Sequence, residues 1–401
     1  MHYSRIKLHN ELHARPSLYF SPPASVFHAA FLVSSNESDP ALEEIAGDYQ
    51  ASPHGFSRFG NTEFKWERHG EFVTVTCVML GARGLDWANP PTRWRKLLDA
   101  LDHAIINLCQ IEIVDDKEQQ FDISNYKFID PAGSKIGKGS GAIWSDFRLT
   151  TEGACRFVLV NYSLNPYRLG RMVRRILEIE TYRMMSLLAL PLAQEVTESL
   201  QELEQELIKL SDLASETPHS RTQSLVDDIA KLSSRVARIS IYSKTRFSAT
   251  IAYSDLVFER ILELREEHTG QSQRVGVFIE RRFRPSVRYC SATSLRLTQM
   301  IEGVRNLSEL VQARAQVEVE EQNAAILKSL DARAKTQVKI QKAVEGLSII
   351  ATTYYLTSLL KLAYQGSDAL GISFSPSEAI LLSTPIVAGV IWRIRKKTKH
   401  L

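Results

Sequence analysis

The chain has 401 residues and a formal net charge of +3, with 49 lysines and arginines against 46 aspartates and glutamates. This length allows two or three domains with their own cores, and the nearly balanced charge argues against a nucleic-acid partner. The four cysteines lie far apart without a CxxC pair, which indicates reduced, buried thiols rather than a disulfide framework or a zinc ribbon. Residues 1–12 carry charge and no apolar core, so no signal peptide is expected and the soluble body is predicted to stay in the cytoplasm.

Residues 1–163 are predicted to form an α/β domain. A tight turn at residues 69–70 would join two of its strands into a hairpin. Apolar residues at helical spacing predict a helix over 94–109 that packs on a sheet face. Residues 136–141, IGKGSG, look like a phosphate loop but lack its spacing, so a loop between strands is predicted. The strand-like segments are 25–33, 62–68, 71–80, 142–149 and 155–162.

Residues 164–285 are predicted to form a domain of long antiparallel helices, over 167–190, 194–215 and 222–268, because short loops join them. Arg168, Arg171 and Arg175 share one face of the first helix. An anion or a lipid headgroup could bind there, and ion pairs within the helix or between subunits are the alternative.

A stalk helix is predicted over residues 286–342, because no proline occurs from 286 to 364 and the only glycines there are Gly303 and Gly346. Together with the apolar segment that follows, this helix would reach on the order of 120 Å. Apolar residues spaced three and four apart form a coiled-coil seam, interrupted by an acidic cluster at 318–321. Such a seam needs a partner, either other helices of this chain or the same helix in a neighbouring subunit.

Two apolar segments after the stalk predict a membrane hairpin, with spans at 343–364 and 376–392 around an outer loop at 365–375. The loop has no lysine or arginine, whereas the tail at 393–401 is strongly basic, so the positive-inside rule places both termini in the cytoplasm. Buried helices of a soluble core are the alternative. The predicted fold class is therefore an α+β membrane protein, with an α/β domain, a helical domain and a stalk continuous with the first span.

A polar stripe follows one face of the stalk and the first span. An ionisable or hydroxyl-bearing stripe in a membrane helix normally faces a bundle interior or water, so these residues are predicted to line a pore. The alternative is that Glu345 lies at the membrane interface and the hydroxyl groups bond to their own backbone. The stripe consists of Gln341, Glu345, Ser348, Thr352 and Tyr355.

The sequence contains no Ser-His-Asp, Cys-His or two-carboxylate pattern at an interpretable spacing, so no enzyme activity and no bound cofactor are expected. His9 and His13 are four residues apart and could share a helix face that holds a metal. Their order with Glu11 is not that of a metalloprotease motif, and a polar segment that docks on the domain is the alternative.

Several segments resemble a bacterial family of uncharacterised membrane-anchored proteins with a domain of unknown function. These segments include the NELHARP motif at residues 10–16, WERHGEF at 66–72 and LEIETYRM at 177–184. Shorter matches are EQN at 321–323 and EGLS at 345–348 with the following Tyr354 and Tyr355. The resemblance implies a bacterial inner-membrane location and no established activity.

The order of domains also resembles CorA-type cation channels, in which five subunits surround a pore lined by the first span. In that superfamily the first span ends in a Tyr-Gly-Met-Asn filter, whereas this chain has Tyr364-Gln-Gly-Ser367. The resemblance implies a pentamer and an outer mouth, and Lys361 would add positive charge there. The predicted mouth residues are Lys361, Tyr364, Gln365 and Gly366.

The leading functional hypothesis is a CorA-like homo-oligomer in a lipid bilayer that forms a passive channel or transporter for cations. A divalent cation would be the permeant or regulatory ion, and the cytosolic domain would regulate the pathway. The alternative hypothesis is a membrane-anchored scaffold or sensor without transport activity.

Overall fold

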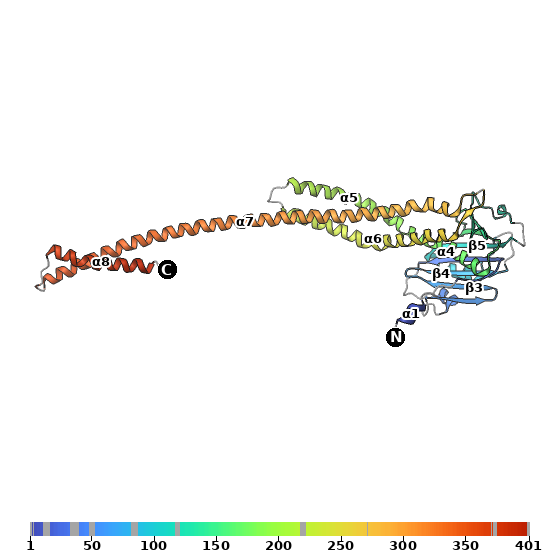
Figure 1. Ribbon diagram of the computed structural model, residues 1–401, viewed down its shortest axis with the longest axis horizontal. Coiled ribbons are helices and arrows are strands. Elements are labelled where there is room, and N and C mark those ends of the chain that lie inside the picture. Colours follow the sequence, from blue (N-terminus) through green and yellow to red (C-terminus); the bar gives the residue numbers. More distant parts are fainter. Residues whose placement is uncertain are drawn as a thin grey trace. The chain divides into compact units, whose positions relative to one another are not determined.

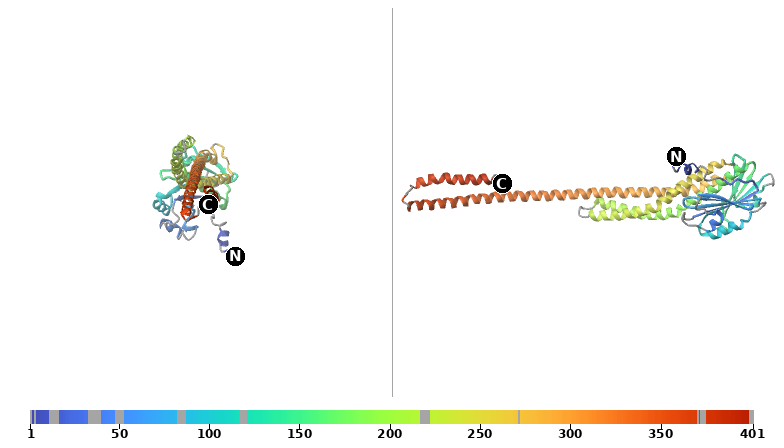
Figure 2. Two further views of the ribbon diagram at one scale, coloured as in Figure 1. Left: turned by 90° about the vertical axis from the view of Figure 1, so that its left-hand side faces the viewer. Right: turned by 90° about the horizontal axis from the view of Figure 1, so that it is seen from below.

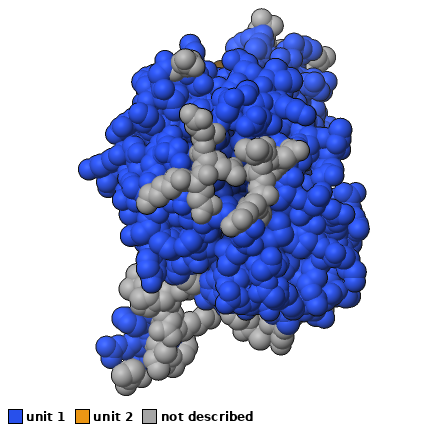
Figure 3. All heavy atoms as spheres, turned by 90° about the vertical axis from the view of Figure 1, so that its right-hand side faces the viewer, with its two compact units in different colours: residues 1–216, 224–308 blue, residues 217–223, 309–401 orange. Residues whose placement is uncertain are grey.

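The computed structural model describes residues 2, 4–10, 17–32, 40–47, 53–81, 87–116, 121–216, 222–270, 272–369, 371 and 375–398. The chain divides into two compact units, and the face drawn in Figure 3 consists mainly of atoms of unit 1, in blue. Unit 1 comprises residues 1–216 and 224–308, and unit 2 comprises residues 217–223 and 309–401. Residues 11–16 of the NELHARP motif, with His13, lie outside the described residues.

Unit 1 is built on a mixed sheet that has nine strands within the described residues, in the order β2-β3-β4-β1-β5-β8-β7-β6-β9 (Figure 1). Neighbouring strands are antiparallel except β5 and β8, which are parallel. The strands are β1 Ala24–Phe31, β2 His54–Phe59, β3 Thr62–Arg68, β4 Val73–Leu80, β5 Ile105–Asp115, β6 Ala132–Ile136, β7 Gly141–Ser145, β8 Cys155–Asn161 and β9 Glu267–His268.

Helices cover both faces of this sheet, because alternate residues of a strand point to opposite sides. In β1, Phe27 and Phe31 belong to an apolar cluster with α2 (Pro40–Ala46) and α3 (Thr92–Ala100). Val26 and Ala30 belong to the larger cluster on the other face. That cluster contains α4 (Pro166–Leu187), the end of α6 (Thr222–Leu264) and the start of α7 (Val275–Ala369). Short helical segments also occur at α1 (Arg5–Asn10), η2 (Asp102–Ala104) and η3 (Ile123–Tyr126).

The predicted helix over 94–109 is wrong in its second half. Helix α3 ends at Ala100, and residues Ile105–Asp115 form β5, the strand that pairs with both β1 and β8. Its apolar residues pack on both faces of the sheet, and Asn107, Gln110 and Glu112 lie between them, so the segment shows no regular alternation. The predicted hairpin is confirmed, because β3 and β4 pair antiparallel around residues 69–72. Residues 137–140 connect β6 and β7, as the sequence predicts.

The three predicted long helices are present as α4, α5 (Ala189–Glu216) and α6. Both views of the ribbon show α5 and α6 beside the first part of α7 (Figures 1 and 2). An ion pair of 2.9 Å joins Arg296 of α7 to Glu204 of α5. Leu297, Met300 and Leu307 are buried, so the first part of the predicted seam has its partner within this chain.

Helix α7 begins eleven residues earlier than the predicted stalk and includes Pro285. Val275, Ile279 and Phe283 of its first turns are buried in the main core, and this burial outweighs the backbone hydrogen bond that proline lacks. A second C-terminal helix, α8 (Pro376–Thr398), follows in unit 2. By length and composition, α7 and the segment Pro376–Ile394 are apolar enough to cross a membrane, with best windows of mean hydropathy 1.2 and 1.4 and no buried residue in either window.

All four cysteines are free and buried, as the sequence predicts. Cys109 of β5 and Cys155 of β8 are partners in the parallel ladder. Burial raises the pKa of both thiols, and also those of Cys77 and Cys290. The thiols are therefore protonated and unreactive in the folded protein.

Candidate functional site

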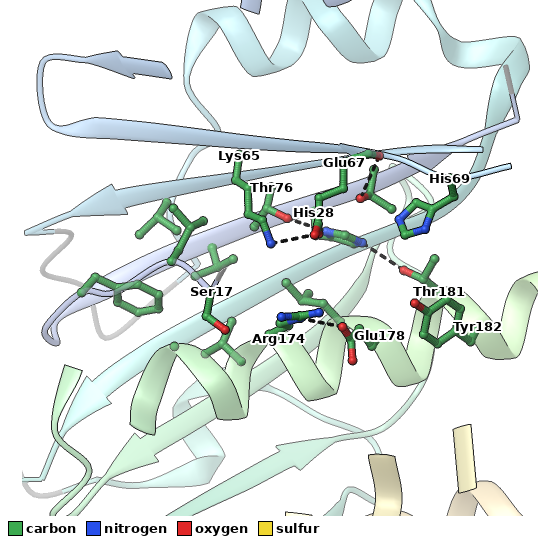
Figure 4. Close-up of a pocket in the computed structure, with 18 of the residues that line it drawn as sticks. Ser17, His28, Lys65, Glu67, His69, Thr76, Arg174, Glu178, Thr181 and Tyr182 are labelled. Atoms are coloured by element: carbon green, nitrogen blue, oxygen red, sulfur yellow. Dashed lines mark hydrogen bonds and ion pairs between the residues drawn. The ribbon is translucent and has the colours of Figure 1, made fainter. Parts of the chain in front are cut away.

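A pocket lies in unit 1 between α4 and the face of the sheet formed by β1, β3 and β4 (Figure 4). Residues 17–20 run along one side of it, and the carbonyl oxygen of Leu18 approaches Gly170 of α4 so closely that a β-carbon at Gly170 would lie 1.8 Å away. The free volume is about 50 Å³, enough for a few water molecules or a very small ligand. A nucleotide or a large cofactor does not fit.

The sheet side of the pocket carries a buried ion pair. Lys65 and Glu67 are two residues apart on β3, so both point to the face that α4 covers, and their charged atoms are 2.9 Å apart. Burial lowers the pKa of Lys65, although the charge of Glu67 opposes this effect. Burial acts to raise the pKa of Glu67, but the charge and hydrogen bond of Lys65 outweigh it, and the net pKa is lowered. Oxygen Oε1 of Glu67 has no hydrogen-bond partner among the described residues.

His28 on β1 lies at the centre of a hydrogen-bond network between the sheet and α4 (Figure 4). Its Nδ1 is 2.8 Å from Oγ1 of Thr76, and its Nε2 is 3.0 Å from Oγ1 of Thr181. Thr181 also accepts a hydrogen bond from Asn107. Burial lowers the pKa of His28 to about 3, so the imidazole is neutral at physiological pH. Both ring nitrogens are occupied by hydroxyl groups, which makes His28 a fixed structural group and not an available base.

The helix side of the pocket carries a second set of charges. Glu178 of α4 accepts hydrogen bonds from Nε of Arg174, at 2.6 Å, and from Nε of Arg260 on α6, at 2.5 Å. Burial acts to lower the pKa of Arg174, but the charge of Glu178 outweighs it and the net pKa is raised. These arginines therefore remain charged, and they tie α4 to α6 beside the pocket.

Positive and negative groups thus face each other across a small, partly apolar cavity. Lys65 and Arg174 can donate hydrogen bonds to an anionic group, and the unpaired oxygen of Glu67 can accept one from a cationic or neutral donor. Within the described part of the chain, no group of three or more His, Cys, Asp and Glu side chains could hold a metal ion. The arrangement is suited to binding a small polar molecule, and it contains no free nucleophile paired with a base among the residues named here.

The polar stripe predicted from the sequence lies on α7, in unit 2. Gln341 donates a hydrogen bond of 3.3 Å to Glu345, and the Thr352 hydroxyl donates one of 2.8 Å to the carbonyl of Ser348. Tyr355 stacks edge-on against Tyr354. All five stripe side chains are exposed or half-buried in the single chain. The hydroxyl of Thr352 thus bonds to its own backbone, and its oxygen keeps lone pairs free to accept.

Three of the predicted mouth residues lie elsewhere on the same helix. Lys361, Tyr364 and Gln365 line a groove between α7 and α8, together with Thr357 and Pro376. At 100° per residue, this face of α7 is about 160° from the middle of the stripe. Helix α8 therefore covers the side of α7 opposite the stripe. Gly366 lies one residue beyond this group and has open space around it.

Sequence reasoning missed the pocket in unit 1. Its polar residues come from β1, β3 and α4, which are far apart in the chain, and no local spacing connects them. One signal was available: Lys65 and Glu67 alternate with Phe64 and Trp66 in a strand-like segment. A strand with large apolar residues on one face and opposite charges on the other indicates either a solvated face or a buried pair, and only the position of α4 separates the two.

Comparison with known protein families identifies the family of this chain. A family described as "Protein of unknown function (DUF3422)" matches residues 1–401, so the chain belongs to this family. None of the curated proteins is similar to the chain. Two of the sequence segments that carry the resemblance line the pocket, because residues 66–72 supply Glu67 and His69 while residues 177–184 supply Glu178 and Thr181.

Proposed function

We propose that this DUF3422 protein is a homo-oligomeric, CorA-like protein of the bacterial inner membrane that conducts cations passively. Unit 1 would be its cytosolic regulatory part, and the two helices of unit 2 would form the membrane hairpin. The observation that carries the proposal is the polar stripe on α7, which lies on the side of that helix that α8 leaves uncovered.

Exposed apolar side chains support the membrane part of the proposal. Unit 2 buries none of the residues in its two apolar windows, and Leu347, Ile350 and Leu381 are each more than two-thirds exposed. In water such a surface is unfavourable, whereas lipid tails remove its cost. The basic tail after Trp392 and the absence of lysine and arginine from residues 365–375 favour cytoplasmic termini.

Exposed apolar seam residues and the polar stripe on α7 support the oligomer. Leu327, Leu330 and Val338 continue the seam along α7, and each is at least half exposed. The stripe residues need neighbours in lipid, since polar groups in hydrocarbon normally face a bundle interior. A pentamer follows from the CorA resemblance.

Cations would be attracted by Glu345 at the cytosolic end and would then meet the oxygens of Ser348 and Thr352. The hydroxyl of Thr352 donates to its own helix, so its oxygen presents acceptor lone pairs, which is what a cation requires. Lys361 belongs to the groove that faces α8, so its charge would lie off the line of the stripe.

Flux through the purified full-length protein in liposomes tests the ion pathway. We expect flux of monovalent or divalent cations above that of empty liposomes under an imposed potential. Thr352→Leu should abolish most of it, and Glu345→Ala should lower it by about tenfold at low ionic strength, where a charged entrance concentrates ions most. Thr357→Leu is the matched control, because Thr357 faces α8.

The membrane and oligomer claims have separate tests. Alkaline phosphatase inserted at residues 370–374 should be active, and the same enzyme fused after residue 401 should be inactive, because it folds only outside the cytoplasm. Inactive fusions at both places would contradict the hairpin. A single monomeric species in mild detergent, seen by mass photometry, would contradict the oligomer.

A second function, a membrane-anchored sensor without transport, is favoured by the pocket between α4 and the sheet. Its balanced charges and the unpaired Oε1 of Glu67 suit a small polar ligand. If liposomes that contain the purified protein pass neither cations nor anions over a range of divalent-ion concentrations, the ion pathway is rejected in favour of the sensor function.

A further inference from the structure

A second depression in unit 1 is rich in arginine. It is open to solvent, has a volume of about 350 Å³, and forms where α4, the end of α6 and the loop between β6 and β7 meet. Its lining is Gly137, Arg168, Arg171, Met172, Arg175, Glu263 and Arg265. Four guanidinium groups therefore face one carboxylate.

The one carboxylate of the lining, that of Glu263, already binds two arginines. Glu263 accepts a hydrogen bond of 2.8 Å from Nε of Arg175 through one oxygen, and one of 3.2 Å from Arg260 through the other. The arginine at 260 lies outside the depression, so Glu263 offsets at most one of the four positive charges that line it. The depression has a net positive charge of about three.

Arg168 is held in place by neutral groups. Its guanidinium donates hydrogen bonds to the carbonyl of Gly137, at 3.2 Å, and to the hydroxyl of Ser140, at 3.4 Å. These bonds fix its position beside the loop, and Arg168 forms no ion pair with any residue in the described ranges. A guanidinium held this way is pre-oriented for a ligand, which reduces the entropy lost on binding.

Arg171 and Arg265 are exposed, and neither forms an ion pair with any residue that the structure describes. Arg171 lies three residues after Arg168 and four before Arg175, and like charges at these spacings destabilise a helix. Arg265 has a left-handed backbone, with a φ of 52°, which is unfavourable for a residue with a β-carbon. The like charges on α4 and the left-handed backbone of Arg265 are both unfavourable and lie at the same place. A bound anion would offset the repulsion between the arginines.

We propose that this depression binds a small soluble anion with more than one phosphoryl group, such as pyrophosphate. Guanidinium groups match phosphate oxygens in pairs, and several together suit more than one phosphoryl charge. The lining that the structure describes includes Met172 but no aromatic ring, so nothing in it selects for a nucleobase beyond the phosphate groups. The inference does not depend on the ion pathway.

The site adjoins the start of α7. Arg265 precedes Glu266, whose carboxylate accepts hydrogen bonds from the first turn of α7 at Gly276. The amide of Gly137 donates to the carbonyl of Leu264, the last residue of α6, directly before Arg265. An anion held by Arg168 and Arg265 therefore links the sheet loop and α4 to the residues that fix the beginning of α7.

Calorimetric titration of pyrophosphate into the full-length protein in phosphatidylcholine nanodiscs tests the site. The wild type should bind saturably and more weakly as salt is added. The double variant Arg171→Gln/Arg265→Gln should bind at least about tenfold more weakly, the loss expected for charged hydrogen bonds. Arg95→Gln, an exposed arginine of α3 on the other face of the sheet, is the matched control and should bind as the wild type does.

The number of phosphoryl groups has its own test. Inorganic phosphate in place of pyrophosphate should bind the wild type at least about tenfold more weakly, because it offers fewer oxygens to the four guanidinium groups. Equal affinity of the wild type and the double variant for pyrophosphate, binding by neither, or phosphate that binds as tightly as pyrophosphate would overturn the proposal.

Discussion

The carboxylate of Glu266 accepts hydrogen bonds from the backbone N–H of Gly276 with both of its oxygens, at 2.9 and 3.0 Å. The preceding amide, that of Val275, donates to the hydroxyl of Ser134 at 2.9 Å. Side chains thus satisfy the first two amides of α7, which have no partner within the helix. Burial raises the pKa of Glu266, but its charged form is the one that complements a helix N-terminus.

Replacing Gly276 by alanine should destabilise unit 1. The new β-carbon would lie 2.5 Å from Cγ2 of Ile261 and 2.6 Å from Oε2 of Glu266, so the start of α7 must shift. We expect a loss of about 1 to 3 kcal/mol in the free energy of unfolding, the usual cost of overpacking. Chemical denaturation followed by tryptophan fluorescence measures it. Gly346→Ala is the control in the same helix, because beyond its chain neighbours and the adjoining helix backbone no described atom lies within 4 Å of the added β-carbon, and it should cause no loss.

Lys65→Met should destabilise the protein by about 3 to 5 kcal/mol, because Glu67 would be left buried without its cation. Adding Glu67→Gln should recover most of this loss, so the double-mutant cycle should give a large coupling energy. Arg58→Met provides the exposed counterpart, since Arg58 is 65% exposed and pairs with Glu63 in the same hairpin. Its effect should stay below about 1 kcal/mol. Additive effects at Lys65 and Glu67 would contradict the buried pair.

Stability should fall with acid because of His28. Its pKa is about 3 in the folded protein, against 6.5 for an ordinary histidine, so below pH 6.5 the unfolded chain takes up a proton that the folded chain does not. Between pH 6 and pH 4 this one group should remove about 1.4 kcal/mol per pH unit. Denaturation at several pH values should show this slope in the wild type and in the exposed control His103→Gln. His28→Gln should lose it, and an unchanged slope would mean that His28 protonates in the fold.

Gly170→Ala should open the pocket from its N-terminal side. The added β-carbon would meet the carbonyl oxygen of Leu18 at 1.8 Å, and backbone atoms cannot move aside without displacing the segment. We expect amide exchange at residues 18–20 to become at least about tenfold faster, which corresponds to about 1.4 kcal/mol of local stability. Amides of β3 in the same variant are the internal reference, and equal protection at residues 18–20 would contradict the contact.

The long helices were predictable from the sequence because their apolar residues repeat every three to four positions and proline or glycine marks their ends. Pro285 misled the prediction, since the burial of Ile279 and Phe283 keeps α7 helical through it. The strand β5 was not predictable, because the spacing of Leu101, Ile105 and Leu108 fits a helix, and only pairing on both sides makes the segment a central strand.

The pocket was less predictable than the fold. His28, Lys65 and Glu178 meet only after the sheet has formed and α4 has crossed it, and a buried pair such as Lys65 and Glu67 looks like any solvated pair in the sequence. The arginines of α4 were visible as one face of a helix. Their common site with Arg265 depends on the left-handed turn after α6, which no local pattern indicated.

The four buried cysteines are natural probes of how often the folded chain opens locally. A protonated thiol inside the sheet reacts with an alkylating reagent only when the strands that cover it separate, so its rate of modification reports how often that happens. Cys109 and Cys155 lie on the parallel pair β5 and β8, whereas Cys290 lies on α7. Mass spectrometry of one sample could therefore time the opening of the central strands and of the long helix separately, without any engineered label.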